Sequence, residues 1–152
     1  MLSNTCKTAI KAVIYIAGQS EKNEKSGIRE VSQGINASEH TVGKILQVLV
    51  KHQLIYSIKG PSGGFFIDKH QEVRPLIDIV YAIDGPNVFK GCGLGLSKCS
   101  TSHPCPIHDQ YKIARDLIEK IFKENTLKTL CAPIAEGLAH LLDWNCVDIV
   151  WQ

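Results

Sequence analysis

The chain has 152 residues, of which 44% are hydrophobic and 21% are charged, with 17 Lys and Arg against 15 Asp and Glu. This length suits one domain, or one domain with an extension, and the apolar content excludes wholesale disorder. No apolar run approaches the roughly 18 residues that a membrane helix needs, and the first residues lack the pattern of a secretion signal. We therefore expect a cytoplasmic protein with no membrane partner.

Positive charge is concentrated in the first half of the chain. Residues 1–70 carry nine Lys and Arg against five Asp and Glu, a net charge of +4, whereas residues 71–152 carry eight against ten, a net charge of −2. The first half could therefore bind a polyanion and the second half could not. Ordinary variation in composition along a chain can produce the same difference in net charge, so charge alone leaves both interpretations open.

Three helices are predicted in the first third of the chain. In the first of them, apolar residues recur at helical spacing and form one stripe: Ala9, Ala12, Val13, Ile16 and Ala17. Residues 27–34 form a short second helix, and Ser38 is a suitable N-cap for a third helix with a polar, partly basic outer face. Short helices joined by a tight turn at Asn36 are typical of a helix-turn-helix.

A β-hairpin is predicted directly after these helices. Residues 54–58 and 65–67 are rich in β-branched and aromatic side chains, and the glycine-rich segment 60–64 joins them in a tight loop. A hairpin after a helix-turn-helix is a wing. The predicted fold class is mainly α with a small β-hairpin wing, namely a winged helix-turn-helix domain followed by a long dimerisation helix.

The rest of the chain is predicted to contain a helix, a loop and a second set of helices. A fourth helix opens at Arg74-Pro75, and residues 86–109 then lose all periodicity and form a long loop. A helical pattern returns from Tyr111 to about Leu130, with a break or cap at Asn125-Thr126. Its apolar stripe (Ala114, Leu117, Ile118, Ile121 and Phe122) is too wide for a small domain to cover, so we expect a dimer partner on it.

The end of the chain is less clearly patterned. A short helix interrupted near Pro133 is expected, and residues 147–152 could form a strand or a tail. We divide the chain into a DNA-binding domain (1–85), a cysteine-containing sensor loop (86–109), and a dimerisation helix with a C-terminal region (110–152).

The predicted wing carries a specific motif. The run LIYSIKGPSGGFFI resembles the wing pattern Leu-Val-x-Ser-Val-Arg-Gly-Pro-x-Gly-Gly-Tyr of the Rrf-two family of bacterial winged-helix transcriptional regulators. TAIKAVIYIA, IREVSQGINAS and VGKILQVL resemble the first three helices of that family, so the resemblance covers about residues 5–130. Lys59 stands where the family typically has Arg, and lysine lacks the planar fork of arginine. This difference predicts a softer sequence preference if the position enters a minor groove.

The resemblance implies a homodimer that binds a double-stranded DNA operator through two half-sites. The predicted contacts lie on the third helix and on the wing: Ser38, His40, Thr41, Lys44, Gln47, Lys51, Lys59, Gly60, Pro61, Ser62, Gly63 and Gly64. Lys44 and Lys51 could reach phosphates, which position a protein without specifying sequence. Ser38 could equally serve only as a cap, and Gln47 could simply be solvated.

Three of the six cysteines, Cys92, Cys99 and Cys105, fall within 14 residues of the predicted loop. In a reducing compartment, such clustering favours metal or redox chemistry over structural disulfides. The resemblance implies an iron–sulfur cluster, either 2Fe-2S or 4Fe-4S, with three cysteine ligands. The fourth ligand is open: His108 is the candidate, His103 is its local rival, and a ligand from elsewhere in the protein is the alternative to both. A zinc site, a metal-free thiol sensor and a loop that binds nothing remain as alternatives.

The sequence thus predicts a DNA-binding transcriptional regulator, either repressor or activator, controlled by an iron–sulfur cluster or by the thiol state of the loop. The alternative is a cluster-free regulator of the same family, controlled by a protein partner or a small ligand. No oxyanion site or substrate pocket accompanies Cys105 and His108, so we expect no enzymatic activity. The other cysteines and the tryptophans are expected to be free thiols and packing anchors: Cys6, Cys131, Cys146, Trp144 and Trp151.

Overall fold

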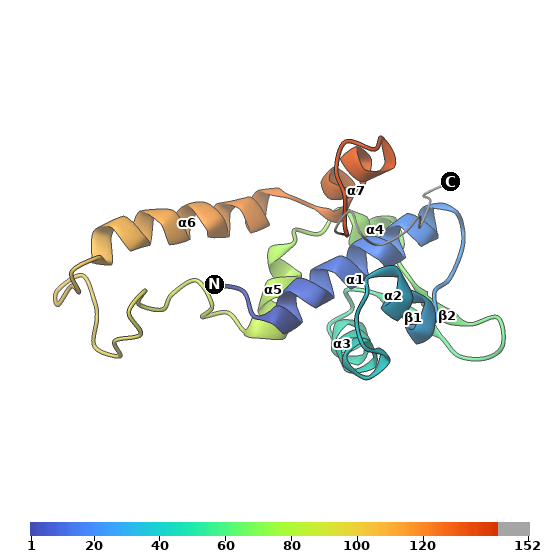
Figure 1. Ribbon diagram of the computed structural model, residues 1–152, viewed down its shortest axis with the longest axis horizontal. Coiled ribbons are helices and arrows are strands. Elements are labelled where there is room, and N and C mark those ends of the chain that lie inside the picture. Colours follow the sequence, from blue (N-terminus) through green and yellow to red (C-terminus); the bar gives the residue numbers. More distant parts are fainter. Residues whose placement is uncertain (143–152) are drawn as a thin grey trace.

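A computed structural model describes residues 1–142 and is mostly helical, with one two-stranded antiparallel hairpin (Figure 1). Its elements are, in chain order, α1 (Asn4–Glu21), α2 (Ile28–Gly34), α3 (Glu39–Lys51), β1 (Tyr56–Ile58), β2 (Gly64–Phe66), α4 (Lys69–Glu72), α5 (Ile77–Asp84), α6 (His108–Glu124) and α7 (Leu127–Ala135). The predicted fold class is confirmed. The expectations for residues 147–152 and for Trp144, Cys146 and Trp151 lie outside the described residues.

Helix α1 forms the centre of the fold. It contacts α3, α5 and α7, and Figure 1 shows it running between α3 on one side and α7 on the other. Ser3 caps its first turn by accepting a hydrogen bond from the backbone N–H of Cys6. The predicted apolar stripe is buried along its whole length, and Leu46 and Leu49 of α3 belong to the same core. Burial of these side chains is what fixes α3 against the domain.

The strands of the wing are shorter than predicted. β1 and β2 pair in the register Tyr56↔Phe66 to Ile58↔Gly64, so the predicted strand boundaries at 54 and 67 are wrong. The backbone N–H of Leu54 instead donates to Leu49 O at the end of α3, and the side chains of Leu54, Ile55 and Ile67 are buried in the core. Apolar residues at these positions therefore anchor the hairpin rather than extend it.

The helix predicted to open at Arg74-Pro75 begins two residues later, at Ile77. Pro75 pairs with Thr126 in an isolated bridge, and the N–H of Leu76 donates to Asn125 O at 2.9 Å. This pairing ties the segment before α5 to the start of α7, and the backbone turns helical only at Leu76, the N-cap of α5. The short helix α4 was not predicted, although Asp68 and Gln71 form a capping box around its first turn.

Helix α6 reaches away from the winged domain, and the segment between α5 and α6 folds back beside it (Figure 1). It begins at His108, three residues before the predicted start, and ends at the predicted break, where Thr126 caps α7. Helix α7 continues through Pro133 to Ala135, so the predicted interruption near Pro133 is wrong. A proline at this position removes one N–H donor from the helix. Within residues 1–142, no helix is both long and apolar enough to cross a bilayer.

The apolar stripe of α6 is divided between two faces. Ile118 and Phe122 are half-buried against residues of α5 and the preceding loop, including Val80 and Phe89. Ile113, Leu117 and Ile121 are 71%, 59% and 50% exposed, and no residue of α6 is buried. An exposed row of large apolar side chains at four-residue spacing therefore runs along this helix.

Candidate functional site

The predicted recognition helix presents its polar side chains to solvent. His40, Thr41, Lys44, Gln47 and Lys51 are all exposed on α3. The cap residue Ser38 is also exposed, but its hydroxyl is already engaged. Its Oγ accepts from the N–H of Thr41 at 3.2 Å and donates to Thr41 Oγ1 at 2.8 Å.

The backbone geometry of the wing loop requires glycine at two positions. Gly60 has φ +107° and accepts a hydrogen bond at its carbonyl from the N–H of Gly63, which closes the turn. A Cβ at Gly63 would lie 2.1 Å from Ile58 O, so no side chain fits there. Lys59, Pro61 and Ser62 are exposed at the tip. The wing therefore offers one cation and an unobstructed stretch of backbone to a partner.

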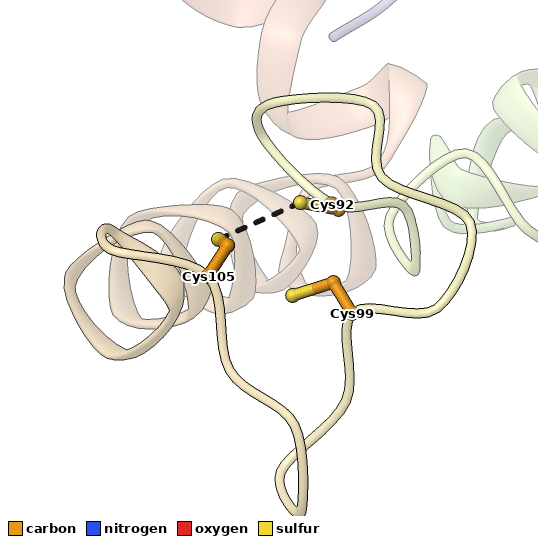
Figure 2. A group of neighbouring side chains, drawn as sticks. All are labelled: Cys92, Cys99 and Cys105. Carbon is orange, nitrogen blue, oxygen red and sulfur yellow. Dashed lines mark hydrogen bonds between the residues drawn. The ribbon is translucent and has the colours of Figure 1, made fainter.

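The three cysteines of the loop converge, with their sulfur atoms all within 4.8 Å of one another. Figure 2 shows the three side chains pointing toward a common centre from separate turns of the loop beside α6. The Sγ atoms of Cys92 and Cys105 are 3.6 Å apart. Thiols are the ligand type that zinc and iron–sulfur clusters take, so the donor type fits such a group.

A histidine nitrogen lies beside this thiol cluster. Nδ1 of His108, the first residue of α6, is 3.1 Å from Cys99 Sγ. The rival His103 is exposed, and its backbone forms a small two-bond pairing with Ser100. The structure thus brings His108, and not His103, into contact with a thiol of the cluster.

Local hydrogen bonds give the thiols different acidities. Backbone N–H groups of Leu96 and Leu94 point at Cys92 Sγ and lower the pKa of this thiol to about 7. The backbone hydrogen bond at Cys105 lowers the pKa of Cys99, but burial and the neighbouring Cys105 and Cys92 thiols outweigh it, so that pKa is raised. Cys92 is therefore more readily converted than Cys99 to the thiolate that binds a metal.

Contacts with α6 hold the loop in place. Arg115 donates from Nη1 to Gly91 O at 3.0 Å, one residue before Cys92. A Cβ at Gly93 would lie 2.7 Å from the ring of Tyr111, so the loop passes directly over that ring. Phe89 stacks on Phe122 with ring centroids 6.0 Å apart. The role of Arg115 was not predictable from the sequence, because a lone arginine on an amphipathic helix gives no indication that it contacts a loop.

The described cysteines outside the loop lie in the core. Cys6 is fully buried, and burial together with Asp84 raises the pKa of its thiol to about 12. Cys131 is 8% exposed, and burial raises the pKa of its thiol to about 11. Both are protonated and shielded at neutral pH, as expected for structural thiols.

Comparison with known proteins identifies relatives over most of the chain. The family model Rrf2, described as an iron-dependent transcriptional regulator, matches residues 2–133. A candidate HTH-type transcriptional regulator of Aquifex aeolicus is 27% identical over 132 residues, covering 86% of this chain and 90% of its own. The HTH-type transcriptional regulator NsrR of Oceanobacillus iheyensis is 23% identical over 128 residues, covering 84% and 87%.

Solved structures show the same fold. CymR, the global cysteine regulator of B. subtilis, matches with a TM-score of 0.71 at 18% identity, covering 87% of this chain and 96% of its own. IscR of T. potens matches with a TM-score of 0.68 at 16% identity, covering 92% of each chain. At these identities the likeness concerns the fold.

Proposed function

The chain belongs to the Rrf2 family of transcriptional regulators, and from this premise we propose that it binds operator DNA as a homodimer under the control of a metal group in the cysteine loop. The convergence of Cys92, Cys99 and Cys105 beside His108 carries the proposal. In this scheme, residues 1–85 bind DNA, residues 86–109 sense the signal, and residues from 110 onward join two chains.

The DNA contacts are proposed on α3 and the wing. His40 and Thr41 lie in the first turn of α3, the part of a recognition helix that meets base edges in the major groove. Lys44, Lys51 and Lys59 would meet phosphates, and their exposure leaves them available. Ser38 contributes chiefly as the cap of α3, because its hydroxyl is held by Thr41.

We propose that the α6 helix of a second chain covers the exposed row formed by Ile113, Leu117 and Ile121. Side chains this large, exposed at four-residue spacing, are typical of a helix that packs against another helix. A two-fold dimer would present two α3 helices to two half-sites of one operator. Homodimerisation is therefore part of the proposal.

We propose that Cys92, Cys99 and Cys105 hold an iron–sulfur cluster and that His108 is the remaining ligand. Such a group supplies sensitivity to iron supply, to oxidants or to nitric oxide when bound. Two contacts would transmit the presence of the cluster to the winged domain. The loop contacts α6 through Arg115 and Tyr111. Helix α6 in turn contacts α5, because Tyr81 donates a hydrogen bond to Glu119. A change in loop conformation would thus shift α6 relative to the winged domain.

Anaerobic purification followed by iron, sulfide and zinc analysis tests the metal proposal. We expect iron and sulfide in stoichiometric amounts, lost in Cys92→Ala, Cys99→Ala and Cys105→Ala and retained in the matched control Cys131→Ala. Stoichiometric zinc without sulfide would replace the cluster by a structural zinc site. Metal-free protein after attempted reconstitution would leave a regulator that senses through thiols or another ligand.

DNA binding is tested separately, with a duplex selected by the protein from a random-sequence pool. We expect affinity to fall steeply with salt, because phosphate contacts release counterions. Lys44→Ala and Lys59→Ala should weaken binding, whereas Lys128→Ala, on α7, should not. Binding that is indifferent to salt and to both lysine substitutions would contradict the proposed interface.

A further inference from the structure

We propose that a basic groove beside the wing, lined by Lys25 and Arg29, binds the phosphate backbone of the same DNA duplex that α3 contacts. The groove lies between residues 23–30, which lead into α2, and the wing turn at residues 61–63. We call it the wing groove. The inference rests on the proposed DNA binding and adds two residues that neither the helix-turn-helix pattern nor the wing motif indicated.

One wall of the wing groove is attached to the wing itself. Ser26 and Phe65 exchange two backbone hydrogen bonds, from Ser26 N–H to Phe65 O at 3.0 Å and from Phe65 N–H to Ser26 O at 2.8 Å. Gly64 has φ +145°, and a Cβ there would lie 3.0 Å from Cβ of Lys25. Ser26 therefore pairs with β2 as a very short third strand beside the hairpin. This pairing fixes Lys25 relative to the wing.

The same wall of the wing groove is attached, further along the chain, to the recognition helix. Ile28 packs on Gly43 of α3, where a Cβ would lie 3.5 Å from Ile28 Cδ1. Gly43 directly precedes Lys44, one of the proposed phosphate contacts. Arg29 therefore directly follows a residue that contacts α3, and the groove that Arg29 lines also contains the wing turn.

The cations of the wing groove are available for a ligand. Lys25 and Arg29 are exposed, and within residues 1–142 neither forms an ion pair. Nζ of Lys25 lies 6.0 Å from the centre of the Phe66 ring, a contact that leaves its charge uncompensated. The one carboxylate of the groove, Glu30, already accepts a hydrogen bond from the N–H of Gly27 at 2.7 Å.

The ligand that suits this surface is a chain of phosphates. A guanidinium can take a phosphate with two parallel hydrogen bonds, and an ammonium can take one as a point charge. A duplex on α3 presents its backbone to neighbouring surfaces of the protein, as the first helix of a helix-turn-helix crosses that backbone. Lys25 and Arg29 would therefore set the position of the duplex and would add affinity without sequence preference.

The test compares Lys25→Ala and Arg29→Ala with the charge-matched control Lys128→Ala. Affinity is measured over a range of salt concentrations for a duplex selected by the wild-type protein and for an unrelated duplex of equal length. We expect each groove variant to weaken binding of both duplexes by about three- to tenfold and to lower the salt slope by about one. Lys25→Arg and Arg29→Lys should keep the salt slope of the wild type.

The possible results separate the wing groove from the proposed function. If Lys44→Ala and Lys59→Ala weaken binding while both groove variants stay within about twofold of Lys128→Ala, the groove is overturned and the recognition helix stands. If the wild type binds neither duplex, both are overturned. If only Lys25→Ala has an effect and Lys25→Arg shares it, the residue acts through packing on Phe66, and thermal denaturation of these variants would show the same loss.

Discussion

The winged domain that we propose over residues 1–85 and the arm formed by the loop and α6 (residues 86–124) are held in shape by different forces. The winged domain has a continuous core in which α1 and α3 bury whole rows of apolar side chains. In the arm, α6 buries no residue, and the loop contacts it through the Phe89–Phe122 ring contact and the Arg115–Gly91 hydrogen bond. Phe89 is the residue of the loop that also packs in a small core cluster with Val80 of α5. One region therefore specifies its own conformation, while the other depends on a few contacts.

This difference suggests where control enters the molecule. A region with few buried contacts opens at low free-energy cost, so a ligand or a partner chain can redistribute its conformations. A metal on the thiol cluster and a second copy on α6 would both act on the arm. The winged domain would then move as a rigid unit, which preserves the spacing between α3 and the wing.

The largest expected effect tests the core of the winged domain. Leu46 of α3 is fully buried, so Leu46→Ala removes apolar contacts and leaves a cavity. We expect a loss of about 2–5 kcal/mol in the free energy of unfolding, measured by urea denaturation. The neighbouring exposed residue provides the control, and Gln47→Ala should change stability by less than about 0.5 kcal/mol. Equal losses in the two variants would contradict the described core.

Thiol reactivity provides the next contrast between the two regions. The pKa of Cys92 is about 7, whereas burial raises the pKa of Cys131 to about 11. In metal-free protein near neutral pH, iodoacetamide should therefore modify Cys92 about a hundredfold faster than Cys131, even after the lower nucleophilicity of the more acidic thiol is counted.

The rate of this reaction at Cys92 should depend on pH in a defined direction. Only the thiolate reacts, so the rate at Cys92 should rise with pH through a midpoint near 7 and then level off. Mass spectrometry of the modified peptides follows each site, and Cys92→Ser removes the fast phase. A midpoint near the value of a free thiol would show that the amides of Leu94 and Leu96 do not hold Cys92 in solution.

A smaller effect is expected from the exposed face of α6. Leu117 is 59% exposed in a single chain, so Leu117→Asp should leave the stability of the winged domain unchanged. If this face joins two chains, the substitution places a charge in an apolar interface and should raise the dimer dissociation constant at least about tenfold. Sedimentation velocity measures this constant, with Lys120→Ala on the same helix as control. A dimer unaffected by Leu117→Asp would place the interface elsewhere.

Much of the winged domain could be predicted from the sequence, because its elements follow local rules. The apolar stripe of α1, the cap at Ser38 and the glycines of the wing each determine structure within a few residues. The errors arise where distant segments meet. Strand 54–58 is shortened because Leu54 bonds back to α3, and α5 starts late because Pro75 pairs with Thr126, about 50 residues away.

The candidate site was predictable in composition but not in geometry. The spacing of Cys92, Cys99 and Cys105 indicated a thiol cluster, but only the family resemblance favoured His108 over His103. That distinction depends on α6 beginning at His108, which points Nδ1 at Cys99, while His103 lies in a separate turn. Arg29 and Lys25 carried no signal, since their role depends on how the segment before α2 pairs with the wing.

The smallest expected effect tests the link between the two regions. Tyr81 of α5 donates a hydrogen bond of 3.0 Å to Glu119 Oε1 of α6, and Glu119 also pairs with Lys123. Tyr81→Phe removes this bond and should cost about 0.5–1 kcal/mol of stability at pH 7, because a part-exposed bond contributes modestly. Thermal denaturation measures the loss, with Tyr56→Phe on the wing as control, since its hydroxyl takes no part in the link.

The pH dependence of that loss identifies the hydroxyl as its source. Burial and the hydrogen bond to Glu119 raise the pKa of Tyr81 above its usual 10.0, so the folded state holds this proton more tightly than the unfolded state. The stabilisation is therefore complete below about pH 10 and is lost as the pH rises through the higher folded value. The free energies of unfolding of wild type and Tyr81→Phe should differ by a constant amount up to about pH 10 and converge at higher pH. A difference that persists unchanged into strong alkali would mean that the hydrogen bond from the Tyr81 hydroxyl to Glu119 is not the source of the loss.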